Sequence, residues 1–370
     1  MIKDLTIKEI HIPFRVSFKH ASAERAKTEG IWVEAVSETG ERGFGEACPR
    51  SYVTGETVES TIHFFSTVKA EVIQDVGSLH DLRAWVAQNK QAIDENPAAW
   101  CAIELALLDL FAREAGTSVE TLLAMPPLQG RFHYSAVVGD GSFPQFQTQM
   151  KQYLSMGFHD VKVKISGELE KDREKLDWLT QVAAASTPDL RLRVDANNLW
   201  ATSDACIAYF QNLGHPLMAI EEPLAPNHYH DLHQISTALQ TKIILDESFL
   251  RIDQFDALSF APDIWILNLR VSKMGGLIRT IAIAEKARAV GMPIIVGAQV
   301  GETSVLTRAG LSVAHYTKDI LLAQEGAFGL HLLERDVCQP PLMFGAKGIL
   351  DTSTYALDQA VGFGLNFYSG

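Results

Sequence analysis

Lysines and carboxylates follow short apolar, β-branched segments of this sequence at regular intervals. Lys162 and Lys164 lie in VKVKIS, Asp195 ends LRLRVD, Glu221 follows MAI, and Asp246 follows KIIL. Side chains two residues apart on a strand point the same way, so the two lysines share one face. A second ammonium group, a metal ion or burial each lower the pKa of a lysine, which acts as a base only when that pKa falls. The pair therefore predicts proton abstraction, against the alternative of a solvated edge strand.

The three carboxylates would repel one another strongly unless a cation lay between them. Oxygen ligands favour Mg²⁺ or Mn²⁺, with water and substrate in the remaining coordination positions. A single aspartate at the end of a strand more often caps the next helix. Three carboxylates in phase with one repeat, facing two lysines, instead indicate a metal site at Asp195, Glu221 and Asp246.

The spacing of these residues predicts the elements that hold them. The polar strand ends recur every 24 to 26 residues from Asp195 through Glu221 and Asp246 to Arg270. Continuous apolar strands alternate with amphipathic helices, such as residues 168–185. Apolar strands of this kind belong to a parallel sheet buried on both faces, and a βα repeat of nearly constant length indicates a (β/α) barrel. The carboxyl ends of its strands meet at one mouth, where such enzymes place their active sites.

The segments before and after this repeat have a different pattern. Residues 5–14 and 30–38 alternate like strands, and residues 57–73 and 96–116 have helical spacing. The tail after residue 339 is rich in Gly, Pro and aromatic residues and leaves the βα pattern. We therefore expect the tail to return and pack on the N-terminal third of the chain.

The composition limits the partners of the protein. A net charge of −13 over 370 residues argues against nucleic acid and anionic membranes, since both attract basic surfaces. The four cysteines have no CxxC spacing and are expected to be reduced thiols in a cytoplasmic protein. The N-terminus carries charges every few residues, unlike a signal peptide, and no apolar run approaches the roughly 18 residues that span a bilayer.

Taken together and in this order, VKVKIS, VDANNLW, IEEPL, LDESF and KMGG resemble the motifs of the enolase superfamily, in its muconate-lactonizing subgroup. That subgroup includes muconate cycloisomerases, dipeptide epimerases, N-acylamino acid racemases and o-succinylbenzoate synthases. GFGEACPRSYVTGET and NPAAWCAIELALLDLFAREAG resemble its capping domain, so the similarity covers nearly the whole chain. The resemblance implies an α/β fold, a modified TIM barrel of the (β/α)₇β type over residues 129–335. An α+β capping domain over residues 1–128 would be completed by residues 336–370, and the protein would be a homo-oligomer.

The resemblance also implies the mechanism of an enzyme that acts on a small-molecule carboxylate. Lys164 would remove the proton α to the substrate carboxylate, and Mg²⁺ on the three carboxylates would stabilise the enediolate. Lys162 would lower the pKa of Lys164 and help to neutralise the developing charge. Three further residues are expected to support the metal ligands without binding the metal: Asn197, Glu222 and Glu247.

One departure from the family pattern concerns the sixth strand. Where the family has a lysine, this chain has Arg270, and Lys273 follows in the KMGG turn. Arginine is almost always protonated and is a poor base, although it can stabilise an enolate, stack on a substrate ring or bind a carboxylate. Arg270 therefore favours one-base chemistry, in which Lys164 takes and returns the proton. The reaction would be syn β-elimination of the o-succinylbenzoate synthase type or muconate-type cycloisomerisation.

Two alternatives remain open. An epimerase or racemase of dipeptides or N-acylamino acids would need Lys273 to reach the substrate, or Arg270 to lose a proton. A non-catalytic metal-binding barrel protein would keep the fold without the reaction, since fold alone does not determine function.

A second departure concerns the eighth strand and the substrate. Dipeptide epimerases of the subgroup carry a DxD pair there that binds the substrate ammonium, whereas this chain has Gln324 and Glu325, which disfavours a simple dipeptide epimerase. Basic residues in the loops that this family uses for selectivity indicate an anionic or polar distal group, with ordinary solvated charge as the alternative. The remaining candidates for substrate contacts are His20, Arg25, Arg50, Tyr52, Lys273, Gln299 and Glu302.

Overall fold

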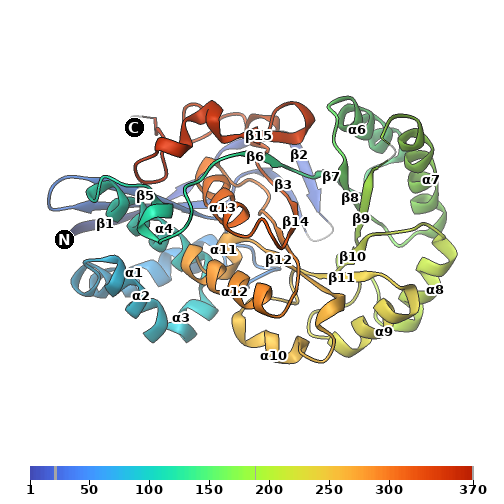
Figure 1. Cartoon of the computed structure of the whole chain (residues 1–370), viewed down its shortest axis with the longest axis horizontal. Coiled ribbons are helices and arrows are strands. Elements are labelled where there is room, and N and C mark those ends of the chain that lie inside the picture. Colours follow the sequence, from blue (N-terminus) through green and yellow to red (C-terminus); the bar gives the residue numbers. More distant parts are fainter. Residues whose placement is uncertain (21–22, 188, 369–370) are drawn as a thin grey trace.

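An eight-stranded parallel sheet lies at the centre of the computed structural model (Figure 1). The structure describes the backbone of residues 1–20, 23–187 and 189–368, and their side chains except at residues 16–25 and 185–186. The strands lie side by side in the order β14, β13, β12, β11, β10, β9, β8, β7. The amide of Ser135, next to β7, donates to the carbonyl of Gln324 in β14 at 2.7 Å, which links the two ends of the sheet. The strands are Ala136–Val138 (β7), Asp160–Lys164 (β8), Arg191–Asp195 (β9), Ala219–Glu221 (β10), Lys242–Leu245 (β11), Trp265–Leu269 (β12), Ile294–Val296 (β13) and Leu321–Gln324 (β14).

Helices connect these strands and cover the outside of the sheet (Figure 1). Their ends follow local sequence: Thr202 caps α8 by accepting from the amide of Ala205 at 3.3 Å, and Gly214 ends it at φ 71°. The strands that the repeat predicts are all present, so the expected α/β barrel is confirmed. The helices are Phe143–Ser155 (α6), Leu169–Ser186 (α7), Ser203–Leu213 (α8), Tyr229–Leu239 (α9), Phe255–Leu258 (α10), Val271–Met274 (α11), Leu277–Ala289 (α12) and Ser304–Tyr316 (α13).

A second, smaller unit is built from the N-terminal residues and forms a cap. Its antiparallel sheet contains β1 (Ile2–Ile10), β4 (Gly30–Ser37) and β5 (Arg42–Ala47), while β2 (Pro13–His20) and β3 (Ala23–Lys27) form a separate hairpin. Gly45 allows β5 to approach a helix closely, because a Cβ there would lie 2.0 Å from the carbonyl oxygen of Ala102. The helices are Val58–Asp75 (α1), Leu79–Gln88 (α2), Lys90–Glu95 (α3), Pro97–Glu114 (α4) and Val119–Leu122 (α5).

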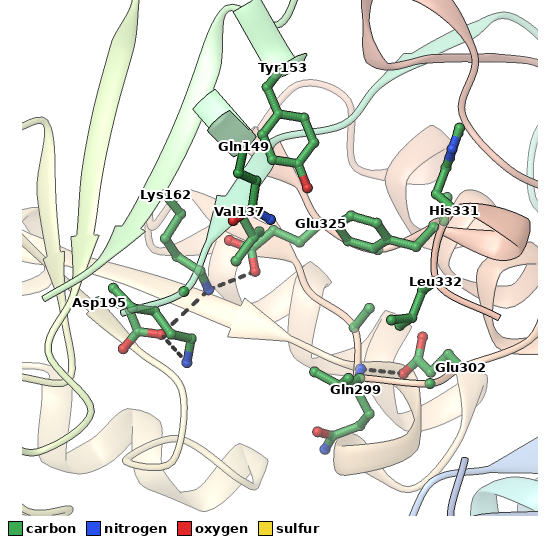
Figure 2. Close-up of a pocket in the computed structure, with 18 of the residues that line it drawn as sticks. Val137, Gln149, Tyr153, Lys162, Asp195, Gln299, Glu302, Glu325, His331 and Leu332 are labelled. Carbon is green, nitrogen blue, oxygen red and sulfur yellow. Dashed lines mark hydrogen bonds and ion pairs between the residues drawn. The ribbon is translucent and has the colours of Figure 1, made fainter. Parts of the chain in front are cut away.

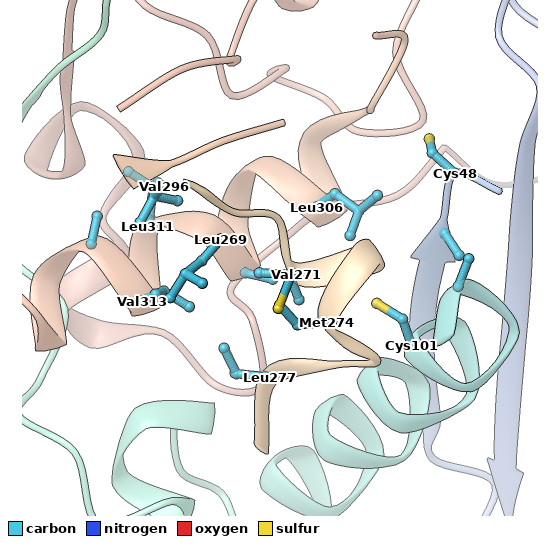
Figure 3. Close-up of a cluster of buried hydrophobic side chains, with 14 of the residues drawn as sticks. Cys48, Cys101, Leu269, Val271, Met274, Leu277, Val296, Leu306, Leu311 and Val313 are labelled. Atoms are coloured by element: carbon cyan, nitrogen blue, oxygen red, sulfur yellow. The ribbon is translucent and has the colours of Figure 1, made fainter. Parts of the chain in front are cut away.

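Helix α4 joins the cap to the barrel. All of its residues except Arg113 and Glu114 are buried, because β4 and β5 lie against one side and α11 and α12 against another. Figure 3 shows Cys101 of α4 beside Met274 of α11 within this apolar contact. The predicted amphipathic helix is thus covered on nearly every side.

Buried carboxylates of the cap bind backbone amides at the beginning of two barrel helices. Glu46 in β5 accepts from the amides of Thr303 at 2.7 Å and Leu306 at 3.0 Å, at the start of α13. Glu104 in α4 accepts from the amide of Ile278 in α12 at 2.9 Å. The carboxyl oxygens accept from amides that the start of a helix leaves unpaired, so these contacts fix the cap on the barrel.

The C-terminal segment contacts both units. β15 (Ile349–Asp351) pairs with β6 (Arg131–His133), and the amide of Phe363 donates to Asp109 of α4 at 2.8 Å. The ring of Phe367 packs at a tilt against Phe44 of the cap sheet, with the ring centroids 4.2 Å apart. The tail therefore contacts the N-terminal unit, while domain boundaries at residues 128 and 335 stay a prediction. Among the described residues, no helix is both long and apolar enough to cross a membrane.

Candidate active site

A pocket of about 580 Å³ opens where the strands of the barrel end (Figure 2). Its walls come from the ends of β8, β9, β12 and β13, from α6, and from the loop after β14. Tyr52 of the cap also lines it. The pocket lies where a parallel barrel presents the carboxyl ends of its strands, as the sequence predicts.

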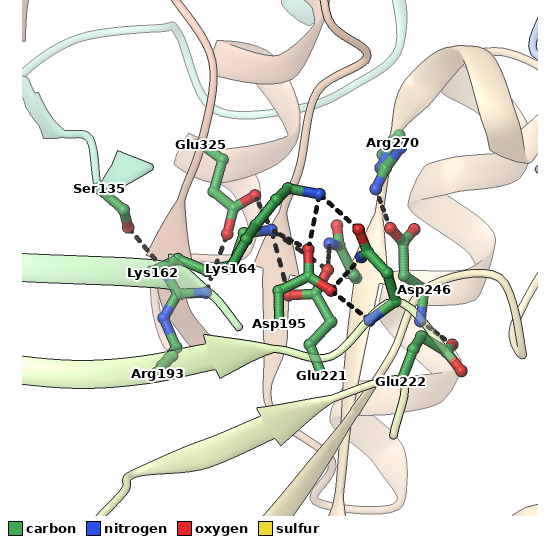
Figure 4. A network of polar contacts seen from close by, with 12 residues as sticks. Ser135, Lys162, Lys164, Arg193, Asp195, Glu221, Glu222, Asp246, Arg270 and Glu325 are labelled. Carbon is green, nitrogen blue, oxygen red and sulfur yellow. Dashed lines mark hydrogen bonds and ion pairs between the residues drawn. The ribbon is translucent and has the colours of Figure 1, made fainter. Parts of the chain in front are cut away.

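The predicted lysines point into the barrel at its mouth. Lys162 and Lys164 are only 3% and 9% exposed. The Nζ atom of Lys162 lies 2.8 Å from Glu325 and 3.2 Å from Glu221, and that of Lys164 lies 3.1 Å from Asp195 (Figure 4). Burial alone would lower the pKa of Lys162, but the charges of Glu221, Glu325 and Asp195 outweigh burial and raise it. Lys162 is therefore a permanent cation in this arrangement.

Three of the predicted residues lie at one level on neighbouring strands. In the register of the sheet Lys164 is opposite Asp195, and Asp195 is opposite Glu221. Asp246 follows β11 by one residue. Burial opposes ionisation of Asp195, but Lys164 and Lys162 lower its pKa to about 2. Burial raises the pKa of Glu221, against the opposing charge of Lys162.

The carboxylates fit a divalent cation such as Mg²⁺ by type, because they offer only oxygen ligands. Each of them is bound to a cation of the chain: Asp195 to Lys164, Glu221 to Lys162, and Asp246 to Arg270. Within the described part of the chain, no three Asp, Glu, His or Cys side chains stand close enough together to hold a metal ion. A metal on these three carboxylates would therefore require Asp246 to turn away from Arg270.

Arg270 and Lys273 both hold Asp246, from different sides. Arg270 follows β12 directly, binds one oxygen of Asp246 and donates to the side-chain oxygen of Gln299 at 2.7 Å. Lys273 in α11 is 1% exposed and donates to the other oxygen of Asp246 at 2.8 Å and to the carbonyl of Asn268 at 2.7 Å. Lys273 does not belong to the residues that line the pocket. The hydrogen bonds of the Lys273 ammonium group therefore support the loop that carries Asp246, outside the pocket.

The three residues that were expected to support the metal ligands lie beside them. Asn197 accepts from Lys164 at 2.9 Å and also contacts Asp195. Glu222 accepts from the amides of Asp246 at 2.6 Å and Ser248 at 2.8 Å, so it shapes the loop that carries Asp246. Glu247 lines the pocket, and burial raises its pKa to about 8.

The other predicted substrate contacts divide into two groups. Tyr52, Gln299, Glu302 and Glu325 line the pocket. Arg50 and Gln324 do not: the guanidinium of Arg50 donates to the carbonyls of Glu29, Pro49 and Val300, and Gln324 donates to the hydroxyl of Tyr134. The side chains of His20 and Arg25 lie outside those that the structure describes.

Sequence reasoning missed a buried ionic network beneath the lysines. Arg193 is fully buried and donates to Glu325 at 3.0 Å, Asp160 at 2.7 Å and Ser135 at 2.7 Å (Figure 4). Burial opposes ionisation of Glu325, but Lys162 and Arg193 lower its pKa to about 2. The alternation in LRLRVD could have revealed Arg193, which lies two residues before Asp195 on the same face of β9.

Sequence reasoning also missed the wall that α6 contributes. Gln149 and Tyr153 project from α6 into the pocket, opposite Leu332 from the loop after β14 (Figure 2). Burial raises the pKa of Tyr153. Nothing in the local sequence distinguishes these side chains from those of an ordinary amphipathic helix.

The fold and site are those of a parallel αβ barrel with buried lysines and carboxylates at its mouth. The sequence family described as "Mandelate racemase / muconate lactonizing enzyme, N-terminal domain" matches residues 3–124, and "Enolase C-terminal domain-like" matches residues 145–367. The chain belongs to the mandelate racemase/muconate lactonizing enzyme family of the enolase superfamily, as the resemblance implied.

Relatives of known name include epimerases and racemases. The chain is 23% identical over 337 residues to a hydrophobic dipeptide epimerase of Enterococcus faecalis, covering 89% of this chain and 91% of the relative. It is 24% identical over 329 residues to an N-succinyl-L-Arg/Lys racemase of Bacillus cereus, covering 85% and 84%. A crystal structure of a dipeptide epimerase from Enterococcus faecalis, complexed with Mg and L-Leu-L-Tyr, has a TM-score of 0.82 at 22% identity and 99% coverage of both chains.

Proposed function

We propose that this protein is a Mg²⁺-dependent epimerase or racemase of dipeptides or N-acylamino acids that removes the proton α to the substrate carboxylate. The observation that carries the proposal is the alignment of Lys164, Asp195 and Glu221 at one level of the barrel mouth, where Lys164 and Asp195 line the pocket. The names of the relatives favour this alternative over the elimination or cycloisomerisation that Arg270 led us to expect.

In the proposed reaction each charged residue has a separate task. Lys164 takes the α-proton, since it is the more exposed of the two lysines that line the pocket. Lys162, kept charged by Glu221 and Glu325, stabilises negative charge on the substrate carboxylate. Mg²⁺ on Asp195, Glu221 and Asp246 would add positive charge that favours loss of the α-proton.

One-base chemistry is the second candidate, because the residue at the end of β12 is Arg270. Its guanidinium is occupied by Asp246 and Gln299, and an arginine does not serve as a base. With Lys164 as the only base, the proton would return to the same face of the substrate, and the configuration would be retained.

Isotope exchange in D₂O with Mg²⁺ separates the candidates. L-Leu-L-Tyr and N-succinyl-L-arginine are suitable probes, because the first is bound in the similar dipeptide epimerase structure and a relative is named for the second. The proposal predicts deuterium at the carbon α to the carboxylate in both epimers, detected by NMR and chiral chromatography. Lys164→Met should slow epimerisation at least about 100-fold, as expected for loss of a general base. Lys318→Met, at an exposed position away from the pocket, is the matched control.

Two results would contradict the proposal. Label confined to the starting epimer would favour one-base chemistry. Absence of exchange with every probe, together with no Mg²⁺ binding by titration calorimetry, would favour the non-catalytic barrel protein.

A further inference from the structure

The wall of the pocket across from Lys164 is built by β12 and β13. In the strand order, β12 is four strands from β8, which is the opposite position in a ring of eight, and β13 is its neighbour. Arg270 follows β12, and Gln299 and Glu302 follow β13. All three side chains line the same pocket as Lys164. A group that serves the face of the substrate remote from Lys164 must come from this wall.

Glu302 has an uncommitted oxygen on this wall. One oxygen, Oε1, accepts from the amide of Gln299 at 2.7 Å. The other has no hydrogen bond or ion pair with any residue that the structure describes. Figure 2 shows the carboxyl group beside Gln299 at the edge of the cavity, with this second oxygen on the side of Leu332. Glu302 is thus held in place through one oxygen while the other faces the pocket.

The surroundings of Glu302 suit a group that exchanges protons near neutrality. Burial raises its pKa to about 7, against the amide of Gln299 and the charges of Arg270 and Arg50, which favour the ionised form. A general acid or base is most effective when its pKa is near the working pH, and glutamate serves as the carbon base in other barrel enzymes.

Arg270 cannot fill this role itself. Its guanidinium donates to Gln299 and binds Asp246, and arginine keeps its proton. Its charge does lie close enough to Glu302 to lower the pKa of that carboxyl. The residue that stands at the family's usual base position therefore supports a neighbouring carboxyl instead of exchanging protons.

We propose that Glu302 is a catalytic acid–base residue on the face of the substrate opposite Lys164. This inference rests on the proposed epimerase or racemase function. In one direction the amine of Lys164 takes the α-proton, and the electron pair of the C–H bond moves into the carboxylate to form the enediolate. The carboxylic acid of Glu302 then donates its proton to the other face of the same carbon, and the configuration is inverted. The roles exchange in the reverse direction, and solvent water returns both groups to their starting protonation states.

The test compares Glu302→Gln with Lys164→Met in D₂O, using whichever of L-Leu-L-Tyr and N-succinyl-L-arginine the wild type epimerises, with each epimer as starting material. A glutamine keeps an oxygen for the amide of Gln299 but cannot exchange a proton, so the turn is preserved. We expect Glu302→Gln to slow epimerisation at least about 100-fold while one epimer still exchanges its α-proton through Lys164. Lys164→Met should show the complementary pattern, with exchange only in the other epimer. Glu302→Asp should recover part of the activity.

A merely structural role for Glu302 would not produce exchange that is selective for one epimer. The inference is overturned if Glu302→Gln epimerises within about threefold of the wild type, or if it loses exchange of both epimers while its melting temperature and Mg²⁺ affinity are unchanged. Glu168→Gln, at a side chain that is 75% exposed, is the matched control. The wild type could exchange the α-proton of one epimer only, in a reaction that needs Lys164 and that Glu302→Gln does not change. That result would refute the role of Glu302 but would still support enolate formation by Lys164. No wild-type exchange with either probe refutes the proposed function, and the role of Glu302 with it.

Discussion

Replacing Arg193 by methionine should destabilise the barrel strongly, because its charge holds two buried carboxylates. Arg193 has no exposed surface, and its guanidinium donates to Glu325 at 3.0 Å and to Asp160 at 2.7 Å. Removing one partner of a buried ion pair costs about 3–5 kcal/mol, since the remaining charge stays buried. Unfolding entropy of about 2.1 cal/mol/K per residue over 370 residues converts this loss to a fall in melting temperature of about 4–6 °C.

The same strand offers a matched control. Arg191 also pairs with Asp160, at 2.8 Å, but its side chain is 46% exposed. Arg191→Met should therefore cost less than about 1 kcal/mol, as for other exposed ion pairs. Thermal unfolding followed by circular dichroism measures both variants.

A double variant tests the assigned cause. Adding Glu325→Gln to Arg193→Met removes a buried carboxylate that has lost one of its two cations and keeps only Lys162, so part of the lost stability should return, with a coupling energy of at least about 1.5 kcal/mol. Equal melting temperatures for Arg193→Met and Arg191→Met, or additive effects in the double variant, would refute the reasoning.

Three further predictions concern the metal, the pH dependence and the cap. Mg²⁺ at about 100 times its dissociation constant should add about 2.7 kcal/mol to the free energy of unfolding. Arg270→Met should tighten Mg²⁺ binding in calorimetry by removing one of the two cations that hold Asp246, and an unchanged affinity would show that Arg270 does not compete. Burial raises the folded-state pKa of Glu46 to about 8, above the pKa of the same group in the unfolded chain. Ionisation of Glu46 therefore lowers the stability of the fold as the pH rises from the unfolded-state pKa to the folded-state pKa. The melting temperature of Glu46→Gln relative to wild type should therefore increase from about pH 5 to about pH 8, and a constant difference would count against it. Gly45→Ala should lower the free energy of unfolding in urea by about 1–3 kcal/mol or more, because its Cβ would lie 2.0 Å from a carbonyl oxygen of α4. Gly77→Ala, with no atom nearer than 3.7 Å, should leave that free energy nearly unchanged.

The parts of the site that the sequence predicts best are those that depend on a single strand and its neighbours. Periodicity places Lys164, Asp195 and Glu221 at corresponding strand ends, and parallel pairing in register brings corresponding ends together. The local pattern of each strand is therefore enough to predict that these three side chains lie close together. The fold class follows for the same reason, since each βα unit repeats the same apolar segment and helix.

Contacts that depend on closure of the barrel could not be predicted in this way. Glu325 meets Lys162 and Arg193 only because β14 lies beside β7 in the closed barrel. The local sequence does not predict that the first and last strands of the sheet become neighbours. Arg50 illustrates a related limit. Its charge indicated a substrate contact, but its guanidinium donates to three backbone carbonyls instead. Every residue has a backbone carbonyl, so the sequence does not show which ones will accept from an arginine.

Arg270 shows that a single position does not determine the chemistry of a whole wall. Judged alone, an arginine in place of a lysine removes the second base and favours retention of configuration. In the folded chain the guanidinium is one member of a group with Gln299 and Glu302, and the amide of Gln299 also fixes the carboxyl of Glu302. In the mechanism that we propose, the capacity to exchange a proton on that side of the pocket depends on Glu302, one strand away from the substituted position. The number of bases is therefore a property of the wall that β12 and β13 build together, and the identity of residue 270 alone does not decide it.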